Sequence, residues 1–149
     1  MLFKYAIATL VAIVSFVAGV PVEKRHKLNE TVTYLGSQSR ILSGGAAAKG
    51  LVYTAGTVPN ATVIGQGIAN ETRSVIGRLA VILEEAGTSW DYVLKTTVYL
   101  ANMSDYSAMN EVYAELLPNP KPARTAVEVG KLPGNFSIEI EAIAAIPWY

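Results

Sequence analysis

The chain has 149 residues, 51% of them hydrophobic, and its twelve basic and twelve acidic residues cancel to a formal net charge of zero. This length suits a single domain with its own hydrophobic core, and the sequence has no basic run of the kind that nucleic-acid binding needs. The absence of cysteine excludes disulfide scaffolds, thiolate metal sites and cysteine nucleophiles, and the single histidine, His26, leaves no ligand set for a metal.

The N-terminal segment has the composition of a targeting leader. Lys4 supplies a basic start, a long uncharged apolar run follows, and small residues stand at 17–19. This pattern predicts a cleavable signal peptide over residues 1–19, followed by a propeptide or flexible linker over residues 20–40. Two alternatives remain open. Residues 5–22 could form a membrane anchor, or the segment could be a mitochondrial leader, although it lacks the arginines typical of transit peptides.

Two further patterns concern processing. The dibasic pair ending at Arg25 fits a proprotein-processing site and an ordinary solvated charge pair equally well. Five segments match the Asn-X-Ser/Thr pattern of N-glycosylation, which is more than chance gives in a chain of this length. They begin at Asn29, Asn60, Asn70, Asn102 and Asn135. With the leader, they predict a secreted glycoprotein whose folded domain spans residues 41–149.

The first half of this domain contains one strand and one helix. Residues 51–55 are an apolar run between two glycines and predict a buried strand, and Pro59 falls in the turn that follows. Residues 68–86 carry apolar side chains at steps of three and four, which predicts a helix ended by Gly87. Its charged side is expected to face solvent and comprises Glu71, Arg73, Arg78, Glu84 and Glu85.

The second half continues the alternation of strand and helix. Residues 92–100 alternate and are rich in β-branched and aromatic side chains, as in a strand. A second helix is expected between an N-cap at Ser104 and Pro118. Residues 123–129 and 136–146 predict two further strands, joined through a Pro-Gly-Asn turn.

The last of these strands has two different faces. Ile138 and Ile140 begin an apolar face, whereas Glu139, Glu141 and Ile143 alternate onto the other one. Two helices cover only one face of such a sheet, so the second face needs another cover. Self-association is the economical solution, and it would leave polar clefts at the boundary between copies.

Local segments spread over roughly residues 42–146 resemble the RidA (YjgF) family in their amino-acid sequence, order and spacing. The segments containing Pro-Ala-Arg and Glu-Ile-Glu-Ala-Ile-Ala are together highly specific. The matching segments are Glu84-Glu-Ala-Gly87, Val93-Leu-Lys-Thr-Thr-Val-Tyr-Leu100, Met109-Asn-Glu-Val-Tyr113, Lys121-Pro-Ala-Arg-Thr-Ala-Val127 and Ile138-Glu-Ile-Glu-Ala-Ile-Ala144.

This resemblance implies both a fold and an activity. The fold is α+β and chorismate-mutase-like, a mixed β-sheet with two helices packed on one face, assembled as a homotrimer with a ligand cleft between neighbouring subunits. The implied reaction is hydrolysis of small carboxylate-bearing imines or enamines, such as 2-iminopropanoate and 2-iminobutanoate, to the keto acid and ammonia. The resemblance implies no cofactor, no metal and no nucleic-acid partner.

The site residues of the family map onto individual positions of this chain. Arg124 matches the arginine that grips the substrate carboxylate, for which a planar guanidinium is suited, with an ion pair to Glu139 as the alternative role. Glu139 matches the glutamate that positions or activates water, the alternative being a solvated strand residue. Asn110 matches an asparagine near the site, or is a helix-surface amide. Backbone N–H groups around Gly56 and Ala126 are expected to help bind the carboxylate.

Three positions depart from the family pattern. The usual tyrosine falls on Leu42, the usual Ser-Gly-Gln becomes Ala55-Gly56-Thr57, and a frequent cysteine is Ala126. These changes predict a more apolar cleft that favours bulkier or more apolar substrates. The alternative function is a non-catalytic carboxylate-binding or chaperone-like trimer. Ribonuclease activity, described for some relatives, is disfavoured by the near-neutral charge and the lack of histidine in the domain.

Overall fold

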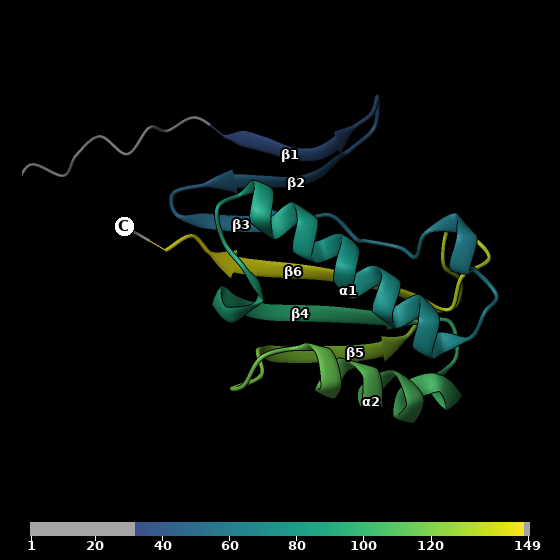
Figure 1. Cartoon of the computed structure of the whole chain (residues 1–149). Coiled ribbons are helices and arrows are strands. Elements are labelled where there is room, and N and C mark those ends of the chain that lie inside the picture. The colour runs from purple at the N-terminus through teal and green to yellow at the C-terminus, as the bar shows by residue number, and fades with distance from the viewer. Residues whose placement is uncertain (1–31, 148–149) are drawn as a thin grey trace, which may run out of the picture.

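The computed structural model describes residues 32–147, so the predictions for residues 1–31 lie outside it. The described part is one six-stranded sheet with two helices on one face (Figure 1). A mixed sheet with both helices on one face agrees with the fold that the family resemblance implies. The strands are β1 (Thr33–Gln38), β2 (Ser43–Ala48), β3 (Leu51–Thr54), β4 (Val93–Leu100), β5 (Ala123–Glu128) and β6 (Ile138–Ala145). The helices are α1 (Ile68–Glu85) and α2 (Tyr106–Leu116), with short 3₁₀ turns η1 (Ala61–Val63), η2 (Trp90–Tyr92) and η3 (Met103–Asp105).

The sheet is mixed, and its last strand lies inside it. The strand order is β1-β2-β3-β6-β4-β5, which leaves β1 and β5 at the two edges. Neighbouring strands are antiparallel except β4 and β5, which run parallel. A parallel pair needs a crossover connection, and α2 supplies it between these two strands (Figure 1).

The two faces of β6 differ as its alternation predicts. Ile138 and Ile140 are fully buried on the helix-covered face, whereas Glu139, Glu141 and Ile143 are only half-buried. The core continues onto α1, where the predicted stripe is buried against the sheet. The opposite face of the sheet thus carries a mixture of apolar and acidic groups that no element of residues 32–147 covers.

Glu71 corrects the prediction that all charged residues of α1 face solvent. Its side chain is completely buried, and its two carboxylate oxygens accept backbone hydrogen bonds from Gly65 at 2.8 Å and from Ser137 at 2.6 Å. A buried carboxylate is tolerated only when it is hydrogen-bonded in this way. Glu71 therefore ties the turn before α1 to the start of β6, which periodicity alone does not reveal.

The first two strands correct the domain boundary. β1 lies inside the segment expected to be linker, and it pairs with β2, so the folded part begins before residue 41. The sequence Ser-Gly-Gly-Ala-Ala-Ala of β2 has low strand propensity. Its small residues instead let α1 approach, because a Cβ at Gly45 would lie 3.3 Å from Cγ2 of Ile82. Packing against the helix, rather than propensity, explains this strand.

The start of the second helix also differs from prediction. Ser104 is not its N-cap: the chain first forms η3, which Asn102 caps through a 2.8 Å hydrogen bond from the backbone N–H of Ser104 to its Oδ1 atom. α2 then begins at Tyr106. Met109, Val112 and Tyr113 of α2 are buried against the core, while Tyr106 stays partly exposed.

Candidate functional site

A cavity of about 510 Å³ lies where the chain leaves the sheet after β3. Residues 55–58 pass beside β6, and Thr57 and Ile140 exchange backbone hydrogen bonds of 2.8 and 3.0 Å. The β1–β2 hairpin and α1 complete the walls. The cavity is lined by Gly36, Ser37, Leu42, Gly44, Ala55, Gly56, Thr57, Val58, Arg78, Val81, Ile82, Pro133 and Glu139. It is mostly apolar with a few polar groups, as ligand sites commonly are.

Glu139 is the acidic group of this cavity. Its side chain lies directly against the backbone of Gly56, where even the methyl group of an alanine would overlap the carboxylate. Burial raises the pKa of Glu139 above the usual range of a glutamate, and the nearby negative charge of Glu141 raises it further. A carboxylate with a raised pKa is a stronger base, which suits proton transfer to and from a bound ligand.

Arg124 occupies a different environment, between β5 and α2. Its guanidinium lies 4.7 Å from the ring centroid of Tyr113 and 5.6 Å from that of Tyr106. Nη2 donates to the Tyr106 hydroxyl at 3.2 Å, and the hydroxyl of Tyr113 is held by buried Thr96 at 2.7 Å. Aromatic faces attract a guanidinium and restrict its plane. The arginine is thus oriented by its own chain, with no acidic partner among the described residues.

The strand register puts Arg124 and Glu139 on opposite faces of the sheet. Arg124 pairs with Thr96, which is buried under the helices, whereas Glu139 pairs with Tyr99 on the other face. Strand β4 also separates the two residues laterally. The suggested ion pair between them does not form within one chain, since the ion pair found in residues 32–147 joins Arg73 and Glu115.

The predicted site residues therefore fall into two groups. Leu42, Ala55 and Gly56 line the same cavity as Glu139. The second group lies around Arg124 at the β5 edge, where Ala126 is half-buried against the core and Asn110 is half-buried on α2. Within one chain the residues of each group lie close together, but the two groups lie apart from each other.

The structure adds cavity residues that sequence reasoning missed. Arg78, Val81 and Ile82 come from α1, and Ser37 and Pro133 come from loops or edges of other elements. Periodicity assigns Arg78 and Val81 to the solvent side of the helix, so nothing in the sequence marks them as site residues. Their contribution follows only from the way the β1–β2 hairpin and residues 55–58 approach α1.

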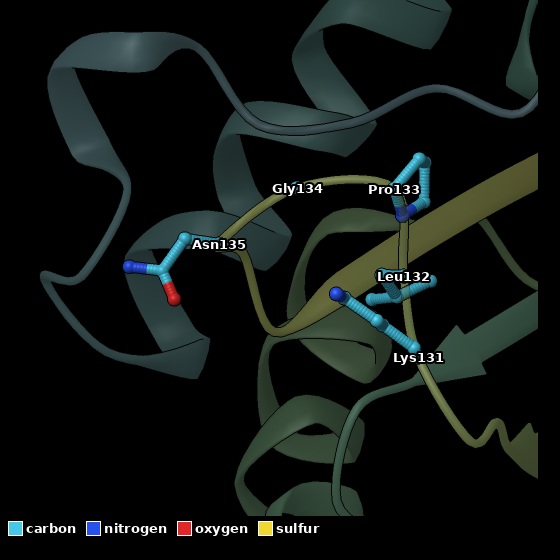
Figure 2. Close-up of a pocket in the computed structure, with 5 residues that line it drawn as sticks. All are labelled: Lys131, Leu132, Pro133, Gly134 and Asn135. Atoms are coloured by element: carbon cyan, nitrogen blue, oxygen red, sulfur yellow. The ribbon is translucent and has the colours of Figure 1, made fainter.

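A second hollow, of about 730 Å³, is formed by one loop between β5 and β6. Figure 2 shows its lining, which runs continuously from Lys131 to Asn135. Pro133 also lines the Glu139 cavity, so the two hollows adjoin there. With Lys131 as its one charged group, this loop offers no acid–base pair, and the Glu139 cavity remains the candidate site.

Comparison with known proteins identifies the family. The family model described as Endoribonuclease L-PSP matches residues 38–146. A RutC family protein of Pyrococcus horikoshii is 46% identical over 101 residues, which cover 65% of this chain and 80% of that protein. Reactive Intermediate Deaminase A, chloroplastic, of Arabidopsis thaliana is 34% identical over 103 residues, covering 66% of this chain and 55% of that protein.

Solved structures of similar proteins point to the same family. A member of the YjgF protein family from Neisseria meningitidis superposes with a TM-score of 0.74 at 29% identity, covering 80% of this chain and 98% of that chain. Yeast Mmf1 gives a TM-score of 0.73 at 30% identity, covering 77% and 98%. The chain belongs to the RidA/YjgF family.

The comparisons contradict the secreted glycoprotein expected from the sequence. The relatives include proteins named as mitochondrial in Schizosaccharomyces pombe, and RutC family proteins of archaea and a cyanobacterium, so the predictions of a signal peptide, secretion and glycosylation are wrong. A basic start and an apolar run are only a compositional pattern. Within residues 32–147, no helix is both long and apolar enough to cross a membrane.

Two of the glycosylation patterns have structural uses instead. The Asn70 side chain donates to the backbone carbonyl of Gln66 at 3.1 Å, and the Asn102 side chain caps η3. Asparagine, serine and threonine are all frequent at such turns and caps, so the Asn-X-Ser/Thr pattern arises there without any glycosylation. The dibasic pair and Asn29 lie outside the described residues.

Proposed function

We propose that this protein hydrolyses small 2-imino carboxylates and their enamine tautomers, with 2-iminopropanoate and 2-iminobutanoate as representative substrates. Water adds to the carbon of the C=N bond to give a carbinolamine. The C–N bond then breaks, the nitrogen leaves as ammonia, and the carbon becomes the carbonyl of the 2-keto acid. Protons move from water to nitrogen, and the reaction needs no oxidant or cofactor.

The observation that carries this proposal is the position of Glu139. It is a partly buried carboxylate with a raised pKa, in a cavity large enough for a small ligand. Such a group accepts a proton from the attacking water and returns it to the leaving nitrogen. The name of the Arabidopsis relative, Reactive Intermediate Deaminase A, supports the same general reaction.

The complete site in this proposal spans two copies of the chain. One copy contributes Glu139 with Gly56, and a neighbour contributes Arg124, whose guanidinium binds the substrate carboxylate bidentately. The separation of these residues on opposite sheet faces supports this arrangement. The uncovered sheet face supports a homotrimer, because its half-buried apolar groups need a partner surface. Asn110 and the backbone N–H of Ala126 complete the Arg124 side.

The cavity walls favour a substrate side chain larger than a methyl group. Leu42 and Ala55 replace hydroxyl-bearing residues of the family pattern, and Val81 and Ile82 extend the apolar wall. We therefore expect faster turnover of a leucine-derived imine than of an alanine-derived imine. A clear preference for the alanine-derived imine would reject this part of the proposal.

The same replacements favour one alternative function, a non-catalytic carboxylate-binding or chaperone-like trimer. Leu42 and Ala55 remove two groups that could assist Glu139 in proton transfer. The two functions share the binding site and differ in turnover.

The experiment that separates them couples an amino-acid oxidase, which generates imines, to the purified protein and follows imine decay. Wild type should accelerate decay, and Arg124→Ala and Glu139→Gln should each abolish the acceleration while remaining folded. Arg73→Ala is the matched control, since Arg73 is exposed and bonded to Glu115 away from both residue groups. No acceleration by wild type with several imines would leave the binding function.

A further inference from the structure

We propose that Arg78 is a second anion-binding residue of the Glu139 cavity and that it binds the side-chain carboxylate of a 2-imino dicarboxylate. This inference rests on the proposed function, because it names the substrate class of the same site. Arg124 of a neighbouring copy would bind the carboxylate next to the imine carbon, and Arg78 the distal carboxylate.

The guanidinium of Arg78 is anchored at one nitrogen and available at the others. Nη1 donates to the carbonyl of Val58 at 2.6 Å and to that of Pro59 at 3.3 Å. Both hydrogen bonds use this nitrogen, and a guanidinium carries five N–H groups in a fixed fork. The side chain is therefore held at the cavity wall while Nε and Nη2 still have N–H groups to offer a ligand.

The charge of Arg78 is not neutralised within the described part of the chain. The ion pair found there joins Arg73, which precedes Arg78 on α1, to Glu115 of α2. Glu139, the cavity neighbour of Arg78, forms no ion pair with it among the described residues. A cation and a carboxylate thus line one cavity without contacting each other.

This separation defines the shape of the ligand. Space between Arg78 and Glu139 would hold the alkyl part of the substrate, against the apolar side chains of Val81 and Ile82. An anionic end then meets Arg78, and the imine carbon meets the water held by Glu139. A dicarboxylate of glutamate type satisfies both ends, whereas a leucine-type substrate satisfies only the apolar wall.

Binding of stable keto-acid products tests the inference without requiring turnover. Titration calorimetry on the full assembled protein would use 2-oxoglutarate and 4-methyl-2-oxopentanoate. A charged hydrogen bond in a partly dry site is worth about tenfold or more in affinity, so wild type should bind 2-oxoglutarate at least about tenfold more tightly. Arg78→Gln keeps an N–H donor for the carbonyls of residues 58 and 59 but removes the charge, and should abolish the preference. Arg73→Gln is the matched control and should retain it.

Three results would overturn the inference. They are no preference for 2-oxoglutarate in wild type, an unchanged preference in Arg78→Gln, or an equal weakening of both keto acids. The last result would mean that Arg78 only holds residues 58 and 59 in place. These outcomes are distinct from failure of the proposed function, which would appear as a lack of imine hydrolysis by a protein that still discriminates between the two keto acids.

Discussion

Replacing Gly56 with alanine tests the site geometry at a single atom. The added Cβ would overlap the carboxylate of Glu139, whereas no other neighbour lies as close. The backbone of Gly56 is not in the left-handed region, so alanine fits it without strain. Because the overlapping group is the end of a flexible side chain, we expect Glu139 to rotate away and the fold to survive.

The size of the effect follows from the role proposed for Glu139. A general acid–base residue contributes roughly 10²–10⁴-fold to rate, and a displacement of about 1 Å costs on the order of 10²-fold. Gly56→Ala should therefore lower kcat for imine hydrolysis about 100-fold. The change in the free energy of unfolding should stay below about 1 kcal/mol, because replacing a glycine whose backbone angles also suit alanine does not by itself destabilise the protein.

The assay combines initial rates of imine decay with urea denaturation of the same preparations. Gly130→Ala is the matched control, because a Cβ at that exposed position meets no atom within 4 Å, and its rate should match wild type. Full activity of Gly56→Ala would refute the placement of Glu139 in the reaction. A loss of activity explained by unfolding would refute the steric reasoning.

Three further predictions concern charge, a buried hydrogen bond and a helix. Glu141→Gln removes a charge that raises the pKa of Glu139, so that pKa should fall and the acid limb of the pH–kcat/KM profile should move to lower pH; an unmoved limb, or one at higher pH, would contradict this. Tyr113→Phe leaves the buried hydroxyl of Thr96 without its partner and should cost about 1–3 kcal/mol of unfolding free energy, with much of the loss recovered on adding Thr96→Val; additive losses would argue against the bond. Gly77→Ala, at an exposed position inside α1, should raise the unfolding free energy by about 0.5–1 kcal/mol in urea titrations, and a decrease would reveal a hidden contact.

Much of the fold can be predicted from the sequence because most of its helices and strands have a regular spacing of apolar residues. The bounds of α1, β4 and β6 agree with the sequence to within one or two residues, since each element has a regular apolar pattern. β2 escapes prediction because its glycines and alanines have low strand propensity and form a strand only through pairing and packing under α1. β1 escapes because it lies in a polar segment expected to be linker and becomes a strand by pairing with β2. Glu71 escapes because a charged residue is normally assigned to solvent.

The site is predictable only in part. Resemblance to the family identifies Glu139, Gly56 and Leu42, and the structure brings them to one cavity. It also identifies Arg124, but no pattern in the sequence says that this residue lies on the other face of the sheet, because that depends on strand order and register. Arg78 has no local signal, since its place in the cavity is created by segments distant in the sequence.

The central claim is an imine-hydrolysing site built from two copies of the chain, and mixing two inactive variants tests it most directly. Arg124→Ala and Glu139→Gln chains, with different tags, would be co-expressed in equal amounts, and the doubly tagged oligomers purified. Each intact site takes Glu139 from one chain and Arg124 from its neighbour, so every mixed trimer, whichever variant is in excess, regains one of its three sites, or about one third. The purified mixed trimers should therefore show about one third of wild-type imine hydrolysis. Mixed oligomers as inactive as either variant alone would contradict a site built from two copies.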